Sequence, residues 1–530
     1  MNTLRCLIPV ILVAGSFAAP CIGGQNPVAQ PDVSITLETD LLRLGIAADG
    51  RTVSFTDKAS GKDYCPKEPR QAFAAIRRQG KTHDATACTL ADGQLTVKFG
   101  DSGVTAVLKA TAKKHYLVFE VASVSDPKVE ELDFAAFRVA LAKHLSGISG
   151  VASDDDFAAC VRALNLQANL ALHGGPSPLF QPTCYAKYGL VGAKIALVGC
   201  PTPRLRPVLQ EVVRGEGLPM SPLGGPFALD AEENRGSYVF ATVSEKNADE
   251  WIALAKKGGL AQIHLISWEK SLGHYEPRKD LFPNGLDGLK SVVAKIHAAG
   301  LRAGMHTLTA CIATNDPFAT PVPDRRFAKD ASFLLAEALG EKDNALRTTE
   351  APKDLDTIWA YGSRGNVLQI DDELIQYSGL AATPPGFTGL TRGAFGTKAS
   401  AHPKGAAAHH LYVRYTSFQP DENTTLVDDV AECIARVFNT CEFDMIYMDG
   451  AEGMMGGWHG VGRMREAIFR KLTRRALVEA SEWGYHSWTF HSRIGAYDHP
   501  NWALKRFVDV HCADTDSYRA SSLLAAQLGW

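Results

Sequence analysis

The sequence predicts an α/β protein in which an antiparallel β-sandwich precedes a (β/α) barrel of the TIM type that carries a small β insertion. Short alternating segments fill the first part of the chain, and strands and helices alternate from Gly236 onward. The stretch 441–450 contains an apolar run that leads to Asp449. Gly450 follows directly, where a buried strand would break into a loop. Because side chains at the carboxyl ends of barrel strands converge on one mouth, we expect the barrel to be built around Asp449.

Composition and charge restrict the class of protein. The 530 residues are 45% hydrophobic and 21% charged, which is typical of a globular chain with two or three domains. The net charge is -3 and the sequence pI is near 6.6. We therefore expect neither a nucleic-acid partner nor attraction to an anionic membrane surface.

The N-terminus has the order of a secretory signal peptide, predicted over residues 1–24. Arg5 precedes an apolar run over 7–14, and small residues follow at Ser16, Ala18 and Ala19. The run is too short to span a bilayer, and we expect no membrane span later in the chain. This pattern predicts a secreted or periplasmic protein.

The cysteines do not form a metal-binding pattern. The chain has 11 cysteines and no CxxC pair, so the spacing does not predict a zinc site. Export would permit disulfides, although isolated cysteines in a large protein are more often small core residues.

The β-sandwich domain is predicted over residues 31–235. Alternating segments such as 33–37, 95–99 and 116–121 are separated by turn pairs such as Asp92-Gly93, a pattern typical of antiparallel strands. The Pro/Gly-rich run 217–226 is predicted to be a linker.

The barrel domain is predicted over residues 236–530. Asn247 is expected to cap a helix that buries Trp251, Leu254 and Ala255, and Gly300 to end a helix over 285–299. The expected strands, in chain order, are 237–242, 262–268, 301–306, the run ending at Asp449, 485–491 and 507–512. Only 14 residues (530 minus 516) follow Asp516, too few for two more strand–helix units. The sequence thus predicts an open or truncated barrel, or one closed by another subunit.

A small β module is predicted as an insertion over 317–415, after the third barrel strand. The segments 366–370 and 373–377 flank an Asp371-Asp372 turn, which is typical of a hairpin. A connection of this length is better explained by an independent element than by a loop.

Three acids are the candidate catalytic residues. Asp449 follows the fourth expected strand, and Asp514 and Asp516 follow the sixth. Retaining glycoside hydrolysis needs two carboxyls about 5 Å apart, one as nucleophile and one as acid/base. Asp516, further into its loop, is the preferred acid/base and Asp514 the alternative, while a structural role is the simpler reading of any single acid.

Aromatic and polar residues at the expected strand ends are the candidate sugar ligands. Sugar sites combine aromatic faces with groups that hydrogen-bond hydroxyls. Glu452 could instead replace Asp449 or be a solvated loop acid, and Arg493 with His491 could bind a carboxylate or sulfate, or Arg493 could pair with Asp498 or Asp509. The predicted substrate-binding residues are Trp268, His306, Glu452, Trp488, His491 and Arg493.

Several other enzyme classes lack their motifs here. The sequence has no GxGxxG after a first strand, no GxxxxGK[ST], no GxSxG and no HExxH. His409-His410 is a lone pair, expected at the surface, and His264 is expected in the core. We therefore expect neither a metal nor a cofactor.

The order of domains and acids resembles the α-galactosidase-like retaining glycoside hydrolases. Pro283-Asn284-Gly285-Leu286-Asp287-Gly288-Leu289-Lys290, followed by 296–305, is similar to a helix-and-strand phrase of that clan. The resemblance covers roughly 236–516 without the insertion. It implies that Asp449 is the nucleophile and Asp514 or Asp516 the acid/base. Tyr447 stands where the family usually has lysine, which is a departure from its pattern.

The predicted function is an exported glycosidase acting on poly- or oligosaccharides by a retaining mechanism. One alternative is a polysaccharide lyase, or another sugar enzyme that abstracts a proton with His or Tyr. Another is a non-catalytic carbohydrate-binding envelope protein.

Overall fold

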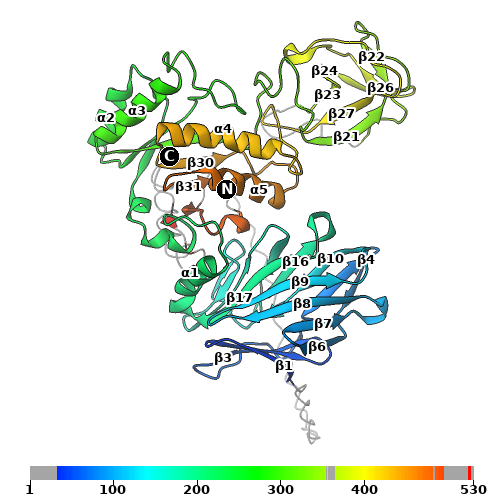
Figure 1. Ribbon diagram of the computed structural model, residues 1–530, viewed down its shortest axis with the longest axis vertical. Helices are drawn as coiled ribbons and strands as arrows, with labels where there is room; N and C mark the ends of the chain where they lie inside the picture. The colour runs from blue at the N-terminus through cyan, green and yellow to red at the C-terminus, as the bar shows by residue number, and fades with distance from the viewer. Residues whose placement is uncertain are drawn as a thin grey trace, which may run out of the picture. The chain divides into compact units, whose positions relative to one another are not determined.

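The computed structural model describes residues 33–353, 355, 365–481, 484–494, 523 and 525–526 (Figure 1). The predicted signal peptide, Asp514, Asp516 and the expected sixth strand lie outside these residues. In the described part the chain is a mixed α/β protein with many antiparallel sheets and few helices. None of its described helices combines the length and apolar character that a membrane crossing requires.

The first part of the chain folds into three antiparallel sheets, which confirms the strand type predicted there. The sheets have the orders β1-β2-β3, β11-β16-β10-β4-β5 with β15 beside β16, and β12-β13-β14-β17-β9-β8-β7-β6. The strands are β1 Val33–Glu38, β2 Leu42–Ala47, β3 Thr52–Asp57, β4 Ala74–Arg78, β5 Lys81–Asp84, β6 Ala87–Ala91, β7 Gln94–Lys98, β8 Thr105–Ala112, β9 Leu117–Val124, β10 Val129–Phe134, β11 Phe137–Arg138, β12 His144–Ser146, β13 Val151–Ser153, β14 Phe157–Ala163, β15 Ala168–His173, β16 Leu179–Tyr185 and β17 Lys194–Pro201.

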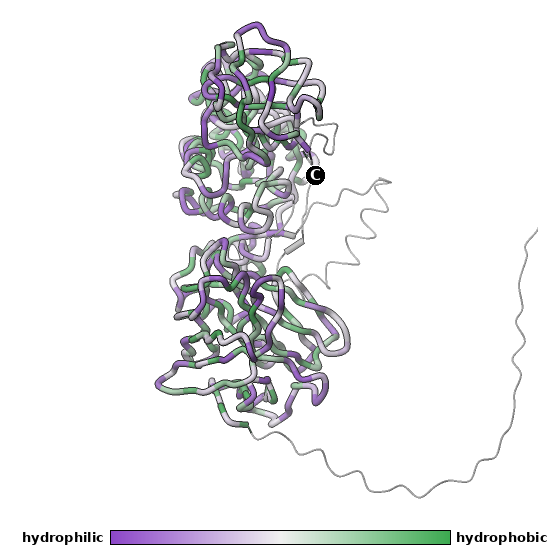
Figure 2. The backbone as a smooth tube through the Cα atoms, turned by 90° about the vertical axis from the view of Figure 1, so that its right-hand side faces the viewer, coloured by the Kyte–Doolittle hydropathy of each residue, from purple (hydrophilic) through white to green (hydrophobic). Residues whose placement is uncertain are grey.

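Alternation along several of these strands places one side in the core. In β7, Leu95 and Val97 are buried between more exposed neighbours. Hydrophilic and hydrophobic stretches are interleaved along the backbone (Figure 2). Phe55, Phe137 and Phe180 continue the core as a stack with ring centroids 4.8 and 4.7 Å apart. Asp92 and Gly93 both have positive φ and join β6 to β7, as the Asp-Gly pair predicts.

Helix α1, Leu205–Gly215, is an element that sequence alternation did not predict. It buries Leu205, Val208, Leu209 and Val212 at helical spacing. The stretch predicted as a linker leads into the 3-10 turns η4, Gly225–Asp230, and η5, Glu232–Arg235.

The second part of the chain contains a five-stranded parallel sheet in the order β18-β19-β20-β30-β31. Its strands alternate with helices, as predicted, but the described strands do not close into a barrel. The strands are β18 Tyr238–Ala241, β19 Gln262–Leu265, β20 Arg302–Leu308, β30 Met445–Asp449 and β31 Leu477–Ala480, and the helices are α2 Ala248–Lys257, α3 Leu286–Ala298, α4 Leu426–Cys441 and α5 Trp458–Lys471.

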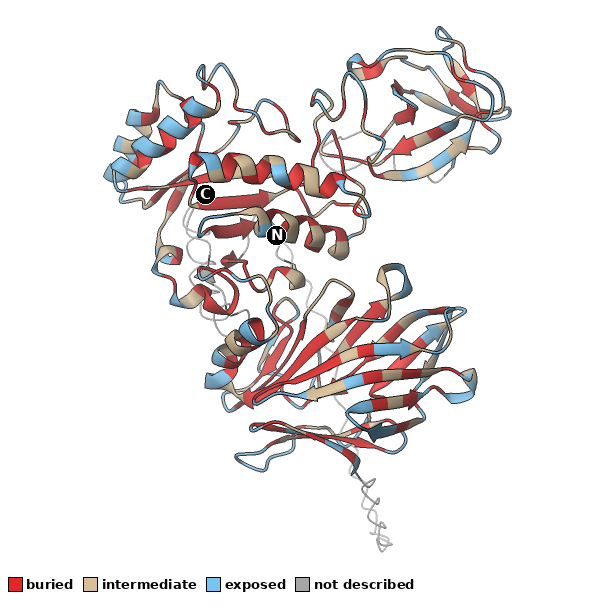
Figure 3. Ribbon diagram, in the orientation of Figure 1, coloured by how far each residue is buried: buried red, intermediate tan, exposed pale blue. Residues whose placement is uncertain are grey.

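The two faces of this sheet differ in chemistry. Ile263, Met305 and Ile446 lie in the same apolar core as the buried side of the helices (Figure 3). On the opposite face, His306, Tyr447 and Glu479 pair across three neighbouring strands. One face of the sheet is therefore apolar, and the other carries aromatic and polar groups.

Two predictions about this part of the chain are wrong. The fifth strand is β31, and the region predicted as that strand begins with the 3-10 turn η8, Tyr485–Ser487. In α2, Leu254 is 51% exposed, whereas Ala255 is buried.

The insertion is a small β module with its own core. Its strands form two sheets, β21-β27-β23-β24 and β22-β26-β25. Leu368, Ile375 and Phe387 are buried between them. The strands are β21 Lys329–Leu334, β22 Ala345–Arg347, β23 Val367–Ile370, β24 Glu373–Gln376, β25 Gly379–Ala382, β26 Pro385–Thr388 and β27 Ala407–Leu411, with a following hairpin of β28 Val413–Arg414 and β29 Ser417–Phe418. Near the end of the chain β32, Arg493–Ile494, pairs with β33, Ala525–Ala526.

Candidate active site

Asp449 lies at the carboxyl end of a buried strand, as predicted. Met445, Ile446 and Met448 are fully buried in β30, and Asp449 pairs with Leu308 at the end of β20. Gly450 follows with φ 75°, and a Cβ there would lie 3.0 Å from the Leu308 side chain. The glycine therefore permits the sharp turn that leaves Asp449 at the edge of the sheet.

The carboxylate of Asp449 is held by hydrogen bonds but remains accessible. Its side chain is 28% exposed, with Oδ2 3.0 Å from Nε2 of His306 and Oδ1 accepting the Gly450 amide at 2.9 Å. Burial opposes ionisation, but the bonds from His306, Ser481 and Gly450 outweigh it and hold the pKa of Asp449 below its ordinary value. Asp449 is thus favoured as a carboxylate, the form a nucleophile needs.

Glu452 lies three residues after Asp449 and has both carboxylate oxygens engaged. Tyr415 donates its hydroxyl to Oε1 at 2.6 Å, and Ser481 donates to Oε2 at 2.8 Å. Ser481 directly follows β31, while Tyr415 comes from the chain that returns from the inserted module. The edge of the sheet thus brings together Asp449, Glu452 and His306, three of the predicted residues.

Glu269 is a further carboxyl at this edge, next to the predicted residue Trp268. It follows β19, and its Oε2 is sealed from solvent with no hydrogen-bond partner in the structure. Burial raises the pKa of Glu269 above its ordinary value, against smaller opposing contributions from backbone amides and His306. The position of Glu269 directly after Trp268, beyond an apolar strand, was the signal available in the sequence.

The environments of Asp449 and Glu269 therefore favour opposite protonation states. His306 interacts electrostatically with both, and its ring lies 5.5 Å from that of Tyr447. Two carboxyls whose environments push their pKa values in opposite directions are a pattern found where one acts as an acid and the other as a carboxylate. The ring of Phe240 packs against the rings of His264 and Tyr447. His264 is fully buried, as predicted.

Trp268 does not offer a stacking face to a sugar, contrary to the prediction. Its side chain is fully buried and lies beside Tyr275 in the core, with ring centroids 6.0 Å apart. Its Nε1 donates to the carbonyl of His306 at 2.9 Å. Trp268 thus satisfies its one polar group inside the core, and its indole holds the backbone of His306 in place.

The other predicted ligands after the fifth strand do not lie at its carboxyl end, because that strand ends at Ala480. Trp488 packs under the guanidinium of Arg162, 4.7 Å from its ring, and donates to the carbonyl of Ala163 at 3.3 Å. His491 is buried, and burial lowers its pKa to about 3.

Arg493 is also buried rather than aimed at a ligand. Its guanidinium lies 3.8 Å from Glu479 and donates to the carbonyls of Glu233 and Gly236 at 3.1 Å each. Neither of the predicted pairings with Asp498 and Asp509 can be compared, since both acids lie outside the described residues. A guanidinium with these partners is a structural cation of the sheet.

The described residues do not form a metal-binding cluster of three or more His, Cys, Asp or Glu side chains. His409 and His410 diverge: His409 bonds to Ser332, and His410 lies buried between Asp330 and Tyr377.

No protein family and no curated protein matches this chain. Solved structures do resemble it. The α-N-acetylgalactosaminidase NagBb from Bifidobacterium bifidum, in complex with GalNAc, matches with 12% identity and a TM-score of 0.47, over 88% of this chain and 81% of that one. The α-galactosidase from Lactobacillus brevis matches with 11% identity and a TM-score of 0.46, over 92% and 75%.

The GH36 α-galactosidase AgaA from Geobacillus stearothermophilus matches with 10% identity and a TM-score of 0.48, over 93% of this chain and 78% of that one. All three proteins are glycosidases by name. With identities this low and TM-scores below 0.5, the function of this chain has to be argued from its own residues.

Proposed function

We propose that this protein is a glycoside hydrolase that cleaves poly- or oligosaccharides by a retaining mechanism with Asp449 as the nucleophile. The observation that supports it best is the partly exposed carboxylate of Asp449, which is hydrogen-bonded to His306 at the carboxyl edge of a parallel sheet. Its lowered pKa supplies the anion that attack on an anomeric carbon requires.

In the first step an oxygen of Asp449 bonds to the anomeric carbon as the bond to the leaving oxygen breaks. A carboxylic acid gives its proton to that oxygen, and the resulting carboxylate then takes a proton from the water that releases the sugar. Asp516 is the proposed acid/base and Asp514 the alternative from the sequence. Glu269 is a further candidate, because burial favours its neutral form.

The test compares Asp449→Asn with the wild type on chromogenic aryl glycosides. Turnover should fall by at least about a thousandfold, since this side chain forms the covalent bond of the first step, which water breaks in the second. Asp444→Asn is a matched control, because Asp444 immediately precedes β30 and bonds to His297 outside the proposed site. Wild-type turnover in the Asp449 variant would remove Asp449 from the mechanism.

The acid/base is identified by comparing Asp516→Asn, Asp514→Asn and Glu269→Gln. Loss of the acid should reduce turnover strongly for substrates with poor leaving groups and weakly for activated aryl glycosides, which need little proton assistance. A residue whose replacement lowers activity equally on both kinds of substrate is not the acid/base.

The lyase alternative has less support. Tyr415, the tyrosine hydroxyl at the sheet edge, donates to Glu452, and burial together with that bond raises its pKa well above the ordinary value. His306 is already engaged by Asp449. Tyr415 is therefore not poised to abstract a proton, but a histidine hydrogen-bonded to a carboxylate is a common general base, so products that absorb as unsaturated uronates would reverse this preference.

We also propose export, with residues 1–24 removed from the mature protein, to the periplasm or the outside of the cell. The support is the order of Arg5, the apolar run and the small residues that follow. N-terminal sequencing of protein recovered from the extracytoplasmic fraction tests this, and an intact Met1 there would contradict cleavage.

A further inference from the structure

The chain returning from the inserted module lies against the loop that follows Asp449. Tyr412 donates its hydroxyl to the carbonyl of Gly453 at 3.1 Å. Gln419 contacts the same loop through Gly453 and Met455, with distances of 3.3 and 3.1 Å. Tyr415 lies between them in sequence and reaches a side chain, Oε1 of Glu452. The return segment, residues 412–419, therefore holds the loop at several points, and Tyr415 is the residue among these three that bonds to a carboxylate.

Tyr415 is presented by a turn of unfavourable backbone geometry. Tyr415 and Thr416 connect β28 to β29 and have φ of 50° and 57°. Turns with two left-handed residues normally contain Asn-Gly, because a side chain, above all a β-branched one, is strained there. Non-glycine residues in such conformations persist where the surrounding structure holds them, often at functional sites.

We propose that Tyr415 is a positioning residue of the active site, and that the inserted module contributes it by aiming its hydroxyl at Glu452. This inference rests on the proposed glycosidase function. Through it, the module becomes a part of the catalytic machinery rather than an appendage.

The contacts of Glu452 specify what Tyr415 does. One oxygen accepts the Tyr415 hydroxyl and the other accepts Ser481, whose hydroxyl also helps to lower the pKa of Asp449. Two hydroxyl donors fix the plane of the carboxylate beside Asp449. Glu452 is then held ready to accept a hydrogen bond from a sugar hydroxyl next to the reacting carbon, where a freely rotating carboxylate would have to be ordered first.

A double-mutant cycle between Tyr415→Phe and Glu452→Gln tests this role. Tyr415→Phe removes one hydroxyl and keeps the ring, so it should lower kcat on aryl glycosides by about tenfold to a hundredfold, the effect of one hydrogen bond to a charged group. In the Glu452→Gln background the same change should have a clearly smaller effect on kcat, because the hydroxyl then donates to a neutral amide oxygen and no longer to a carboxylate.

Tyr412→Phe is the matched control, since it also removes one hydroxyl that joins the return segment to the loop, but its partner is a backbone carbonyl. It should change kcat by no more than about twofold in either background. Thermal unfolding of each variant shows whether the fold is retained.

The outcomes separate the two proposals. If the wild type hydrolyses none of the aryl glycosides, the proposed function is wrong and this inference falls with it. If the wild type is active and Tyr415→Phe slows it by the same factor with and without Glu452, the tyrosine acts through packing alone, and the positioning role is wrong.

Discussion

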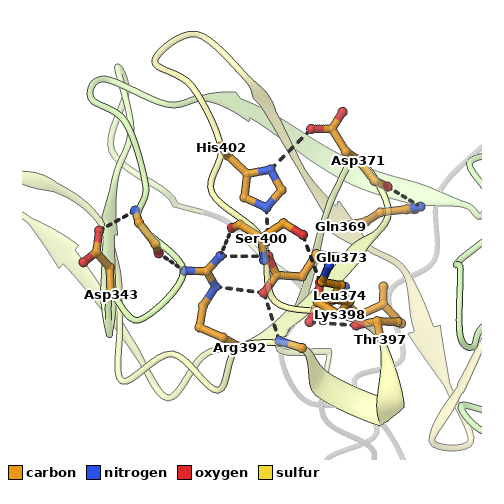
Figure 4. A network of polar contacts seen from close by, with 12 residues as sticks. Asp343, Gln369, Asp371, Glu373, Leu374, Arg392, Thr397, Lys398, Ser400 and His402 are labelled. Atoms are coloured by element: carbon orange, nitrogen blue, oxygen red, sulfur yellow. Dashed lines mark hydrogen bonds and ion pairs between the residues drawn. The ribbon is translucent and has the colours of Figure 1, made fainter.

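Glu373→Gln should destabilise the inserted module severely, because Glu373 holds together a buried network in it. The carboxylate accepts Nε and Nη2 of Arg392 at 2.8 Å each and lies 2.8 Å from Nε2 of His402 (Figure 4). The amides of Gly393 and Ser400 donate to it at 2.9 and 3.1 Å. These donors come from the turn-rich chain between β26 and β27, where the hydroxyl of Thr397 also accepts the amide of Leu374.

The magnitude follows from the titration of Glu373. Burial alone would raise its pKa, but bonds from His402, Arg392 and the two amides outweigh burial and lower it from 4.5 to about 2. Lowering the pKa of Glu373 from 4.5 to about 2 corresponds to about 3 kcal/mol of folding stability at neutral pH. This value already includes the interaction with Arg392, whose side chain is 8% exposed and which also donates to the carbonyls of Gly340 and Ser400.

The sign of the pH dependence is fixed by the direction of the shift. Because the folded pKa is below the unfolded one, this stability is present above pH 4.5 and is lost as the pH falls toward 2. The free energy of unfolding of the wild type should therefore fall over this interval, and that of Glu373→Gln should change less.

Urea denaturation followed by circular dichroism at pH 7 and pH 3 measures both effects. Asp372→Asn is the matched control, because Asp372 lies next to Glu373 but pairs with Arg325 at the surface, with side chains 60% and 70% exposed. An exposed pair contributes about 0–1 kcal/mol. Equal losses for the two variants at pH 7 would refute the assigned role of the network.

Two further predictions concern the support of Asp449. His306→Ala removes the largest of the interactions that favour the Asp449 carboxylate, so the acidic limb of the pH–rate profile should move to higher pH, and an unmoved limb would show that His306 does not tune this acid. Trp268→Ala should lower the free energy of unfolding by about 3–5 kcal/mol, measured by urea denaturation, because it empties a fully buried site; a loss below about 1 kcal/mol would contradict the buried placement.

The parts of the fold that could be predicted from sequence are those with a strong local pattern. The apolar run before Asp449 and the glycine after it indicate a buried strand and its end, and β30 confirms both. The fifth strand was missed because Leu477–Ala480 has only four residues and follows the charged segment 470–475, which extends the helical pattern of α5. An aromatic stretch further on looked more like a strand and contains a 3-10 turn instead.

The site was harder to predict because its contacts are not local. His306 reaches Asp449 across 143 positions of sequence, and Tyr415 reaches Glu452 across 37. The turn that presents Tyr415 lacks the Asn-Gly pair that would have revealed it. Burial, which the sequence does not show, excludes Arg493 as a ligand-binding residue. Its neighbours are aromatic and polar, as in a ligand site, but its side chain is fully buried.

The hydrogen bond from Trp268 to the carbonyl of His306 has a consequence for how mutations in this protein should be interpreted. The indole holds the backbone of the very residue whose imidazole bonds to Asp449. A substitution that changes the packing around Trp268 should therefore also displace the imidazole of His306, and with it the carboxylate of Asp449. Lost turnover in a Trp268 variant would then report on the interior of the protein, since the indole is fully buried.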